Sequence, residues 1–301
     1  MSKPNKETIV EQPTKKFEAP PAGVAETNES RKVASEEILH AEAFKTLKAH
    51  IFDDKTLTDA DKQFCTDACL LRYLRARDYH LERSEKLLRG TLKWRKEYWK
   101  NGALDPNGPL DIEAGTGKVL VHGLDRYKRP VLYLRPRLQN TTNYVEQNRL
   151  TVYMLERCIE SMDASYGTEK LTLIIDFKEY SLRNAPPMAQ NKEFMTILSE
   201  HYPERLGVAI LVDAPMIFNM TYKLLQPFIP AETKKKVVFV SGSAKPGQKK
   251  HEVLSKYLHM NDVPAEYGGD AVFEYDHEHY WSRELSHYDS KRMSQSPLGS
   301  D

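Results

Sequence analysis

The sequence predicts an α/β protein in which an N-terminal all-helical domain precedes a larger domain built on a mostly parallel sheet. Three observations carry this prediction. From Ser35 to about Asn101, apolar residues recur at helical spacing. After a break rich in glycine and proline, short apolar runs alternate with helical segments, which is typical of a parallel sheet covered by helices. The run Leu171–Asp176 is nearly continuously apolar, as expected of a strand buried on both faces.

The helical part is expected to contain three helices. The first opens at Ser35, which supplies an N-cap. The second covers about 58–74 and the third about 81–99, each with an apolar stripe at helical spacing. Glycine and proline residues over 102–109 then break the chain, so we expect the helical domain to end there.

Strands and helices are expected to alternate in the second part. The expected strands are 118–122, 131–135, 171–176, 208–212 and 237–240, and the expected helices are 143–162, 188–200, 215–228 and 251–258. This order predicts a helical domain over 35–105, an α/β domain over 110–275 and a C-terminal extension over 276–301. Residues 1–34 lack apolar periodicity and predict a disordered tail, and the polar stretch from Ser286 onward is expected to resemble it.

The composition indicates a globular protein that meets membranes only at their surface. Hydrophobic residues make up 40% of the chain and charged residues 29%. The net charge of +1 lacks the strong basicity of nucleic-acid-binding proteins. No apolar run approaches the roughly 20 residues that cross a bilayer, and the N-terminus carries neither a secretory signal nor a myristoylation site. We therefore expect a cytoplasmic protein associated peripherally with the endoplasmic reticulum, lipid droplets or the cell periphery.

Metal-binding patterns are weak in this sequence. Cys65, Cys69 and Cys158 lack the spacing of a zinc site, so buried free thiols are the expected state. His277 and His279 flank an acidic residue and would share a face on a strand, but no further ligands accompany them. We expect no bound metal.

Catalytic motifs are also weak. The sequence Gly115–Lys118 resembles part of a phosphate loop, but it lacks the first glycine and has Val119 where magnesium needs a hydroxyl. A solvent-exposed approach to a hairpin is the better interpretation. Spacing alone brings out no nucleophile–base set, so we expect a protein that is not an enzyme.

Six motifs stand in a fixed order along the chain. They are LLRYLRAR (70–77), KWRKEY (93–98), KRPVLYL (128–134), HYPERLG (201–207), QPFIP (226–230) and VPAEYGG (263–269). In combination they resemble the CRAL-TRIO lipid-binding family, and specifically the fungal phosphatidylinositol-transfer proteins of the branch linked to pleiotropic and azole drug resistance. The resemblance covers about 36–273 and implies an apolar lipid cavity closed by a helical lid.

The resemblance also implies a headgroup site for phosphatidylinositol. The positions that match the family's headgroup ligands are Arg77, Glu204, Thr233 and Lys236. Arg77 and Lys236 can neutralise a phosphodiester. Glu204 can accept hydrogen bonds from sugar hydroxyls or pair with Lys236, and Thr233 offers a hydroxyl donor. Taken singly, each residue also suits a surface ion pair or a helix cap.

The expected site for a second lipid departs from the family. Members that carry phosphatidylcholine hold its headgroup with polar residues on three strands. The matching positions here are aliphatic: Val121, Leu132, Leu134, Leu171 and Leu173. Burying a charged headgroup against them would leave its charge uncompensated, so an apolar ligand, a sterol first, fits better. The alternatives are that these residues pack as strand core, or that Tyr133 and His201 bind haem as in other members.

The helix expected over 215–228 suits the lid. It is apolar nearly all round, so it must be buried or face a membrane. Its proposed lid residues are Met216, Phe218, Met220, Tyr222, Leu225 and Phe228. Lys223 and Lys234–Lys236 could orient this helix at anionic lipid, where it would open, exchange its lipid and close. The alternative function is a lipid-sensing module that regulates a partner, such as a phosphoinositide kinase, without net transport.

Overall fold

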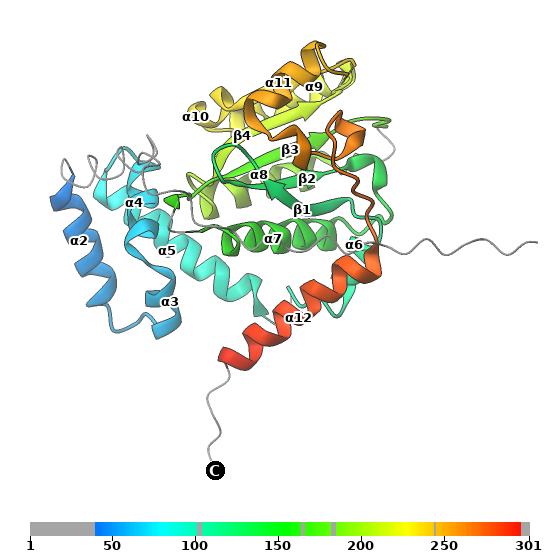
Figure 1. Ribbon diagram of the computed structural model, residues 1–301. Helices are drawn as coiled ribbons and strands as arrows, with labels where there is room; N and C mark the ends of the chain where they lie inside the picture. Colours follow the sequence, from blue (N-terminus) through cyan, green and yellow to red (C-terminus); the bar gives the residue numbers. More distant parts are fainter. Residues whose placement is uncertain (1–39, 101–103, 164–165, 182–184, 244, 296–301) are drawn as a thin grey trace, which may run out of the picture.

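The computed structural model describes residues 40–100, 104–163, 166–181, 185–243 and 245–295, apart from the side chains of 217, 219, 220 and 291–295. The tail expected over 1–34 lies outside this part of the chain, as does the expected N-cap Ser35. A group of helices stands beside a sheet that is flanked by further helices (Figure 1). In the part of the chain that is described, no helix combines the length and apolarity needed to cross a membrane.

The described residues of the N-terminal part include four helices, which share a core of their own. They are α2 (Ala41–Phe52), α3 (Asp59–Phe64), α4 (Asp67–Arg75) and α5 (Leu81–Tyr98). The single helix expected over 58–74 was wrong, because the chain breaks into α3 and α4. Thr58 starts α3 in a capping box with Asp61, and the Thr66 hydroxyl accepts from the Cys69 backbone N–H to start α4. Each of these two threonines starts a separate helix, although the apolar stripe continues through both.

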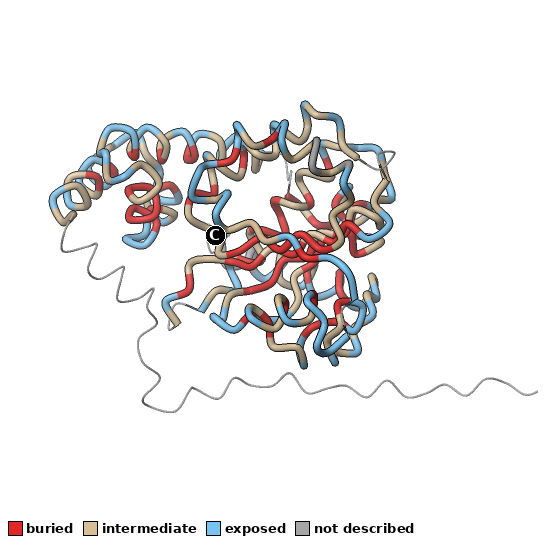
Figure 2. Tube along the Cα trace, turned by 90° about the horizontal axis from the view of Figure 1, so that it is seen from above, coloured by how far each residue is buried: buried red, intermediate tan, exposed pale blue. Residues whose placement is uncertain are grey.

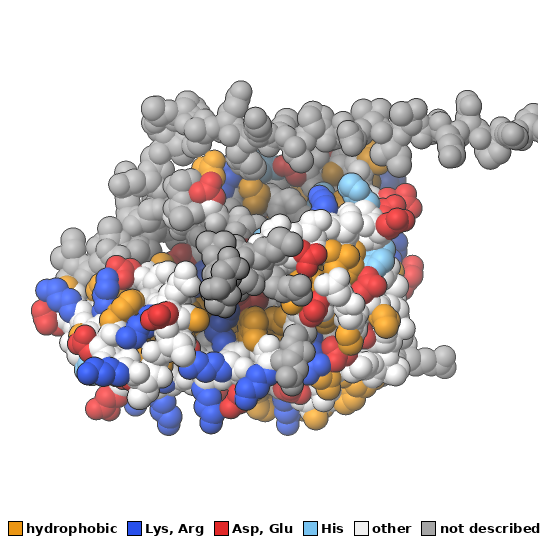
Figure 3. Space-filling view, turned by 90° about the horizontal axis from the view of Figure 1, so that it is seen from below, with side chains coloured by type: hydrophobic (Ala, Val, Ile, Leu, Met, Phe, Trp, Pro, Cys, Tyr) orange, Lys and Arg blue, Asp and Glu red, His pale blue; other side chains and the backbone are white. Residues whose placement is uncertain are grey.

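Basic and acidic side chains are mixed over these helices. On the face seen in Figure 3, blue and red side chains are interspersed at the left, in keeping with the net charge of +1.

Five strands form one sheet in chain order. They are β1 (Val119–Leu124), β2 (Pro130–Leu134), β3 (Leu171–Asp176), β4 (Leu206–Val212) and β5 (Val237–Val240). β1 is antiparallel to β2, and every later neighbour is parallel. The helices of this part are α6 (Pro109–Ala114), α7 (Tyr144–Glu160), α8 (Met188–His201), α9 (Met216–Leu225), α10 (Ala231–Lys235) and α11 (Lys249–Tyr257), with short 3-10 turns η2 (Pro136–Leu138), η5 (Gln226–Phe228), η6 (Met260–Asp262) and η7 (Ala265–Tyr267). The predicted α/β fold with a mostly parallel sheet is confirmed.

The crossover helices all lie on one face of the sheet. Parallel crossovers are right-handed and the strand order advances in one direction, so α7, α8 and α9 with α10 share this side, which we call the lid face. The opposite face packs against the C-terminal turns. There the Tyr267 ring lies 5.6 Å from the Tyr133 ring, and its hydroxyl donates to Asp176 over 3.1 Å. Figure 2 shows the buried strands between these two layers.

The C-terminal extension contains a helix, α12 (His277–Gln295). The polar tail expected from Ser286 was therefore wrong, since α12 continues past it and the sequence has no proline between Pro264 and Pro297 that would end the helix. The first turns of α12 anchor it. The Trp281 indole donates to the Pro106 carbonyl over 3.0 Å, and Arg157 pairs with Glu284 over 2.5 Å.

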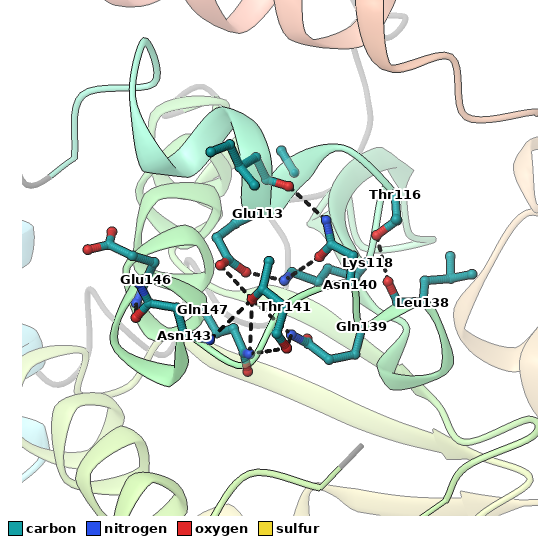
Figure 4. Close-up of polar contacts among 12 residues, drawn as sticks. Glu113, Thr116, Lys118, Leu138, Gln139, Asn140, Thr141, Asn143, Glu146 and Gln147 are labelled. Atoms are coloured by element: carbon teal, nitrogen blue, oxygen red, sulfur yellow. Dashed lines mark hydrogen bonds and ion pairs between the residues drawn. The ribbon is translucent and has the colours of Figure 1, made fainter. Parts of the chain in front are cut away.

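The sequence Gly115–Lys118 leads into β1 from α6 in a buried polar network. The Lys118 ammonium pairs with Glu113 and donates to the Asn140 side chain over 2.9 Å, while the Thr141 hydroxyl donates to Glu113 over 2.6 Å (Figure 4). Lys118 is only 4% exposed, so the solvent-exposed approach that we expected was wrong. Burial lowers the pKa of Lys118, and the neighbouring Glu113 opposes this shift. Lys118 joins α6 and β1 to the segment before α7.

Candidate functional site

Three of the predicted headgroup residues lie where the chain enters β4 and β5. Glu204 lies two residues before β4 and Lys236 directly before β5. Their carboxylate and ammonium are 3.6 Å apart. Thr233 lies one turn earlier, in α10, and its carbonyl accepts from the Lys236 backbone N–H over 3.0 Å. The structure therefore gathers Glu204, Thr233 and Lys236 at the amino ends of neighbouring parallel strands.

The environment of Lys236 suits an anion. Its side chain is 22% exposed and that of Glu204 is 26% exposed, so both remain reachable by a ligand. Burial lowers the pKa of Lys236; Glu204 opposes the shift and the nearby Lys170 adds to it. The Glu204 backbone has a φ of 57°, a left-handed conformation that costs a non-glycine residue roughly 1–2 kcal/mol. Such conformations are concentrated at functional sites.

Arg77 stays apart from these three residues. It lies two residues beyond α4, and its guanidinium donates to the Ala76 carbonyl over 2.8 Å. Among the described residues, it forms no hydrogen bond or ion pair with Glu204, Thr233 or Lys236. An approach of Arg77 to Lys236 would therefore need a ligand between them.

The five aliphatic positions share the lid face. In the strand register Val121 lies opposite Leu132 and Leu132 lies opposite Leu173, while Leu134 and Leu171 follow at two-residue spacing. Leu132 and Leu171 are 3% exposed, as strand core would be. Val121, Leu134 and Leu173 are only half-buried.

The two faces of β3 differ in how tightly they are sealed. On the face away from the lid, Thr172 and Ile174 are 0% exposed. On the lid face, Leu173 and Ile175 of the same central strand remain half-buried although helices cover them. Helix α7 packs directly on β1 and β2, whereas α8 and α9 pack on each other and on η5. At β3, the lid face is therefore less tightly sealed than the opposite face, whereas Ala209 and Leu211 of β4 are buried on the lid face.

The expected lid helix ends earlier than predicted, since α9 stops at Leu225 and the turn η5 completes the segment. Its inner side touches the sheet layer. The Phe218 ring lies 4.2 Å from the Phe177 ring, the Tyr222 ring lies 5.5 Å from the Phe239 ring, and Leu225 is buried.

The outer side of the same segment is exposed and apolar. Met216 is 88% exposed, Leu224 61% and Phe228 38%. The side chain of Met220 lies outside the described part of the structure. The segment thus presents apolar side chains both to the sheet and to solvent.

Tyr133 and His201 do not form a joint site. Tyr133 lies on the face away from the lid, against Tyr267, whereas the His201 ring stacks on Trp94 at 4.2 Å. Across the described residues, no group of three His, Cys, Asp or Glu side chains is placed to hold a metal. The three cysteines are free and buried, as predicted.

A cleft that we did not predict lies away from the lid. It encloses about 490 Å³ between α3, α5, α7 and α12. Its basic side chains have acidic partners: Arg95 is 2.8 Å from Glu156, and Lys96 is 2.6 Å from Asp61. These pairs are closer than the 3.6 Å that separates Lys236 from Glu204, so the cleft cations are the more fully compensated.

His201 makes stability depend on pH. Burial, with a smaller effect of Arg95, lowers the pKa of His201 to about 4, against about 6.5 for an unfolded histidine. Between these values the unfolded chain binds a proton that the folded chain does not. The free energy of unfolding should therefore fall as the pH drops through this window, by at most about 1.4 kcal/mol per pH unit. Urea unfolding at several pH values measures it, and a His201→Phe variant, which keeps a ring against Trp94, should lose that part of the slope. Equal slopes in the two proteins would contradict this account.

Family models match both parts of the chain. The model of the CRAL/TRIO domain matches residues 114–269, and that of the CRAL/TRIO N-terminal domain matches residues 43–90. The first covers the whole sheet together with α7 to α10, and the second covers α3, α4 and most of α2 and α5.

Individual proteins give the same picture. A CRAL-TRIO domain-containing protein of Schizosaccharomyces pombe is 36% identical over 79% of this chain, which spans only 22% of that relative. The phosphatidylinositol transfer protein PDR17 of Saccharomyces cerevisiae is 31% identical over 80% of this chain, and the match covers 68% of PDR17. The crystal structure of Sfh5 superposes with a TM-score of 0.52 at 18% identity, covering 87% of this chain and 97% of that one. That last likeness concerns the fold alone.

Proposed function

Because this chain belongs to the CRAL/TRIO family, we propose that it is a non-enzymatic carrier that binds phosphatidylinositol and transfers it between membranes. The observation that carries the proposal is the pairing of Lys236 with Glu204 beside Thr233, at a site that remains open to a ligand. The similarity to PDR17, which is named a phosphatidylinositol transfer protein, supports the same lipid.

The headgroup chemistry follows from the residues. A phosphodiester placed between Arg77 and Lys236 would receive a planar guanidinium fork from one side and an ammonium from the other. The inositol hydroxyls would donate to Glu204, whose left-handed backbone already directs it toward Lys236. Binding would raise the pKa of Lys236, because the phosphate charge favours the protonated ammonium.

The second ligand would occupy the lid face. An apolar surface is available there from three half-buried side chains, those of Val121, Leu134 and Leu173. These side chains cannot compensate the charge of a ligand. A sterol needs to place only one hydroxyl, whereas phosphatidylcholine would bury a zwitterion there. We therefore propose a sterol as the ligand that exchanges with phosphatidylinositol.

Membrane contact would use the outer side of the lid. Met216 and Leu224 are exposed beside Lys223, and α10 adds the exposed Lys234 and Lys235. Each cation near an anionic bilayer contributes about 1 kcal/mol. Each methylene carried through water would cost about 0.8 kcal/mol, so the lid must close over the acyl chains before the carrier leaves.

The lipids that the protein takes up test the proposal. We expect protein incubated with vesicles of phosphatidylinositol, phosphatidylcholine and ergosterol, then reisolated, to contain phosphatidylinositol and ergosterol on mass spectrometry. Phosphatidylcholine should be at most a minor component, because the lid-face leucines cannot compensate its charges. Recovery of mainly phosphatidylcholine would overturn the proposed second ligand. A protein that takes up lipid but does not move it between vesicles would instead be a sensor that acts on a partner such as a phosphoinositide kinase.

A further inference from the structure

Four charged side chains join the N-terminal helices to the sheet, and we call them the Glu169 clamp. Glu169, just before β3, lies 3.4 Å from Arg72 and 2.6 Å from Arg75, which are both in α4. Its backbone carbonyl accepts from Arg205, just before β4, over 2.8 Å. The clamp is largely shielded from water, with side chains 7% exposed at Arg72, 14% at Arg75 and 18% at Glu169.

Each segment of the clamp also carries a residue of the headgroup site or a neighbour of it. Arg77 follows Arg75 by two residues, and Glu204 directly precedes Arg205. Glu169 is followed by Lys170, which lies near enough to Lys236 to affect it. The clamp therefore connects Arg77, which follows α4, with Glu204 and Lys236, which precede β4 and β5.

The charges of the clamp depend on its single carboxylate. Burial lowers the pKa of Arg205 to about 10, with a further contribution from Arg72 and an opposing one from Glu169. The Glu169 carboxylate offsets the like charges of Arg72 and Arg75, and its backbone carbonyl holds Arg205. Without the carboxylate charge, the backbone bond from Glu169 to Arg205 would remain, but Arg72 and Arg75 would lose their ionic partner, so α4 and the Arg77 segment that follows it would be held less firmly against the sheet.

We propose that Glu169 is a positioning residue for the headgroup. It sets the separation of Arg77 from Glu204 and Lys236, so that a phosphodiester can bridge them. The inference rests on the proposed binding of phosphatidylinositol. It assigns Glu169 no role for an apolar ligand, which would lie on the lid face and make no use of Arg77.

The test compares two buried ion pairs of similar construction. Glu169→Gln removes the clamp charge, and the control is Glu156→Gln, which removes the carboxylate that pairs Arg95 of α5 with α7 and accepts from the Tyr202 hydroxyl over 2.6 Å. We expect Glu169→Gln to bind phosphatidylinositol from mixed vesicles about tenfold more weakly, with binding of the fluorescent sterol dehydroergosterol changed less than about twofold. Glu156→Gln should keep the wild-type ratio of the two lipids, and Glu169→Asp should restore much of the loss. Equal loss of both lipids, loss of neither, or the same selectivity in the control would overturn the positioning role.

A distance measurement reports on the clamp separately. Spin labels at Asp78 and Lys235, both exposed, lie next to Arg77 and Lys236, and the native cysteines are buried. The label separation should broaden or lengthen in Glu169→Gln and stay unchanged in Glu156→Gln. An unchanged separation in Glu169→Gln overturns the clamp, whereas a wild-type protein that binds no phosphatidylinositol overturns the proposed function as well.

Discussion

A Lys236→Glu variant is expected to lose phosphatidylinositol binding by about 100-fold, because a phosphate would lose a charged partner and meet two carboxylates in its place. Glu204, now 3.6 Å from the ammonium, would face a second glutamate and repel it. Equilibrium loading from vesicles, followed by lipid extraction and mass spectrometry, measures the effect. Sterol loading should stay near the wild-type level, since the lid face is unchanged.

The matched control for this variant is Lys235→Glu. Lys235 carries the same charge one residue earlier, but its side chain is 71% exposed and pairs with Glu232 on the surface. Exposed pairs contribute about 0–1 kcal/mol, so equilibrium loading should hardly change. If both variants bound phosphatidylinositol equally weakly, the effect would come from the general charge of the 234–236 segment. That result would contradict the headgroup role of Lys236.

Placing aspartate at both Leu224 and Phe228 is expected to slow vesicle-to-vesicle transfer by at least about 100-fold, because inserting these two side chains into a bilayer contributes about 1.5–3 kcal/mol each. Both are exposed and lie on the outer side of the lid segment. Lipid that is already bound should stay bound, since the inner residues Phe218 and Tyr222 are untouched. Fluorescent-lipid transfer between vesicles measures the rate.

Two exposed apolar residues away from the lid supply the control. Ile112 in α6 is 66% exposed and Val145 in α7 is 50% exposed, so aspartate at both makes the same change in charge and apolarity. Transfer by this control should match the wild type. Full transfer by the Leu224 and Phe228 variant would remove the lid assignment, and slow transfer by the control would show that surface charge alone is responsible.

Much of the fold was readable from local pattern. The strands at 171–176 and 237–240 have the predicted bounds, because a continuous apolar run between polar residues fixes where a strand begins and ends. The break between α3 and α4 was missed, since Thr66 caps a helix inside an unbroken apolar stripe. α12 was missed because it is mostly polar, so the few residues that anchor it, such as Trp281, form no clear apolar periodicity in the sequence.

The site was readable only in part. Motif order identified Glu204, Thr233 and Lys236, and the structure joins them. Glu169 escaped notice because it stands outside every motif, and the two arginines that its carboxylate pairs with lie more than ninety residues away in the chain. Lys118 was misjudged for a different reason: a glycine-rich neighbourhood suggested exposure, while Glu113 and Asn140 enclose it.

The sequence by itself determined the order of the elements, the family and the chemical types at the headgroup and lid positions, because periodicity and motifs are local properties of the chain. Only the tertiary structure decided which charges meet. It placed Lys236 against Glu204, Arg72 and Arg75 against Glu169, and it divided the lid into an inner and an outer side. The physical reason is that ion pairs and burial depend on separations across the sheet and between its layers, and these arise only when distant segments pack together.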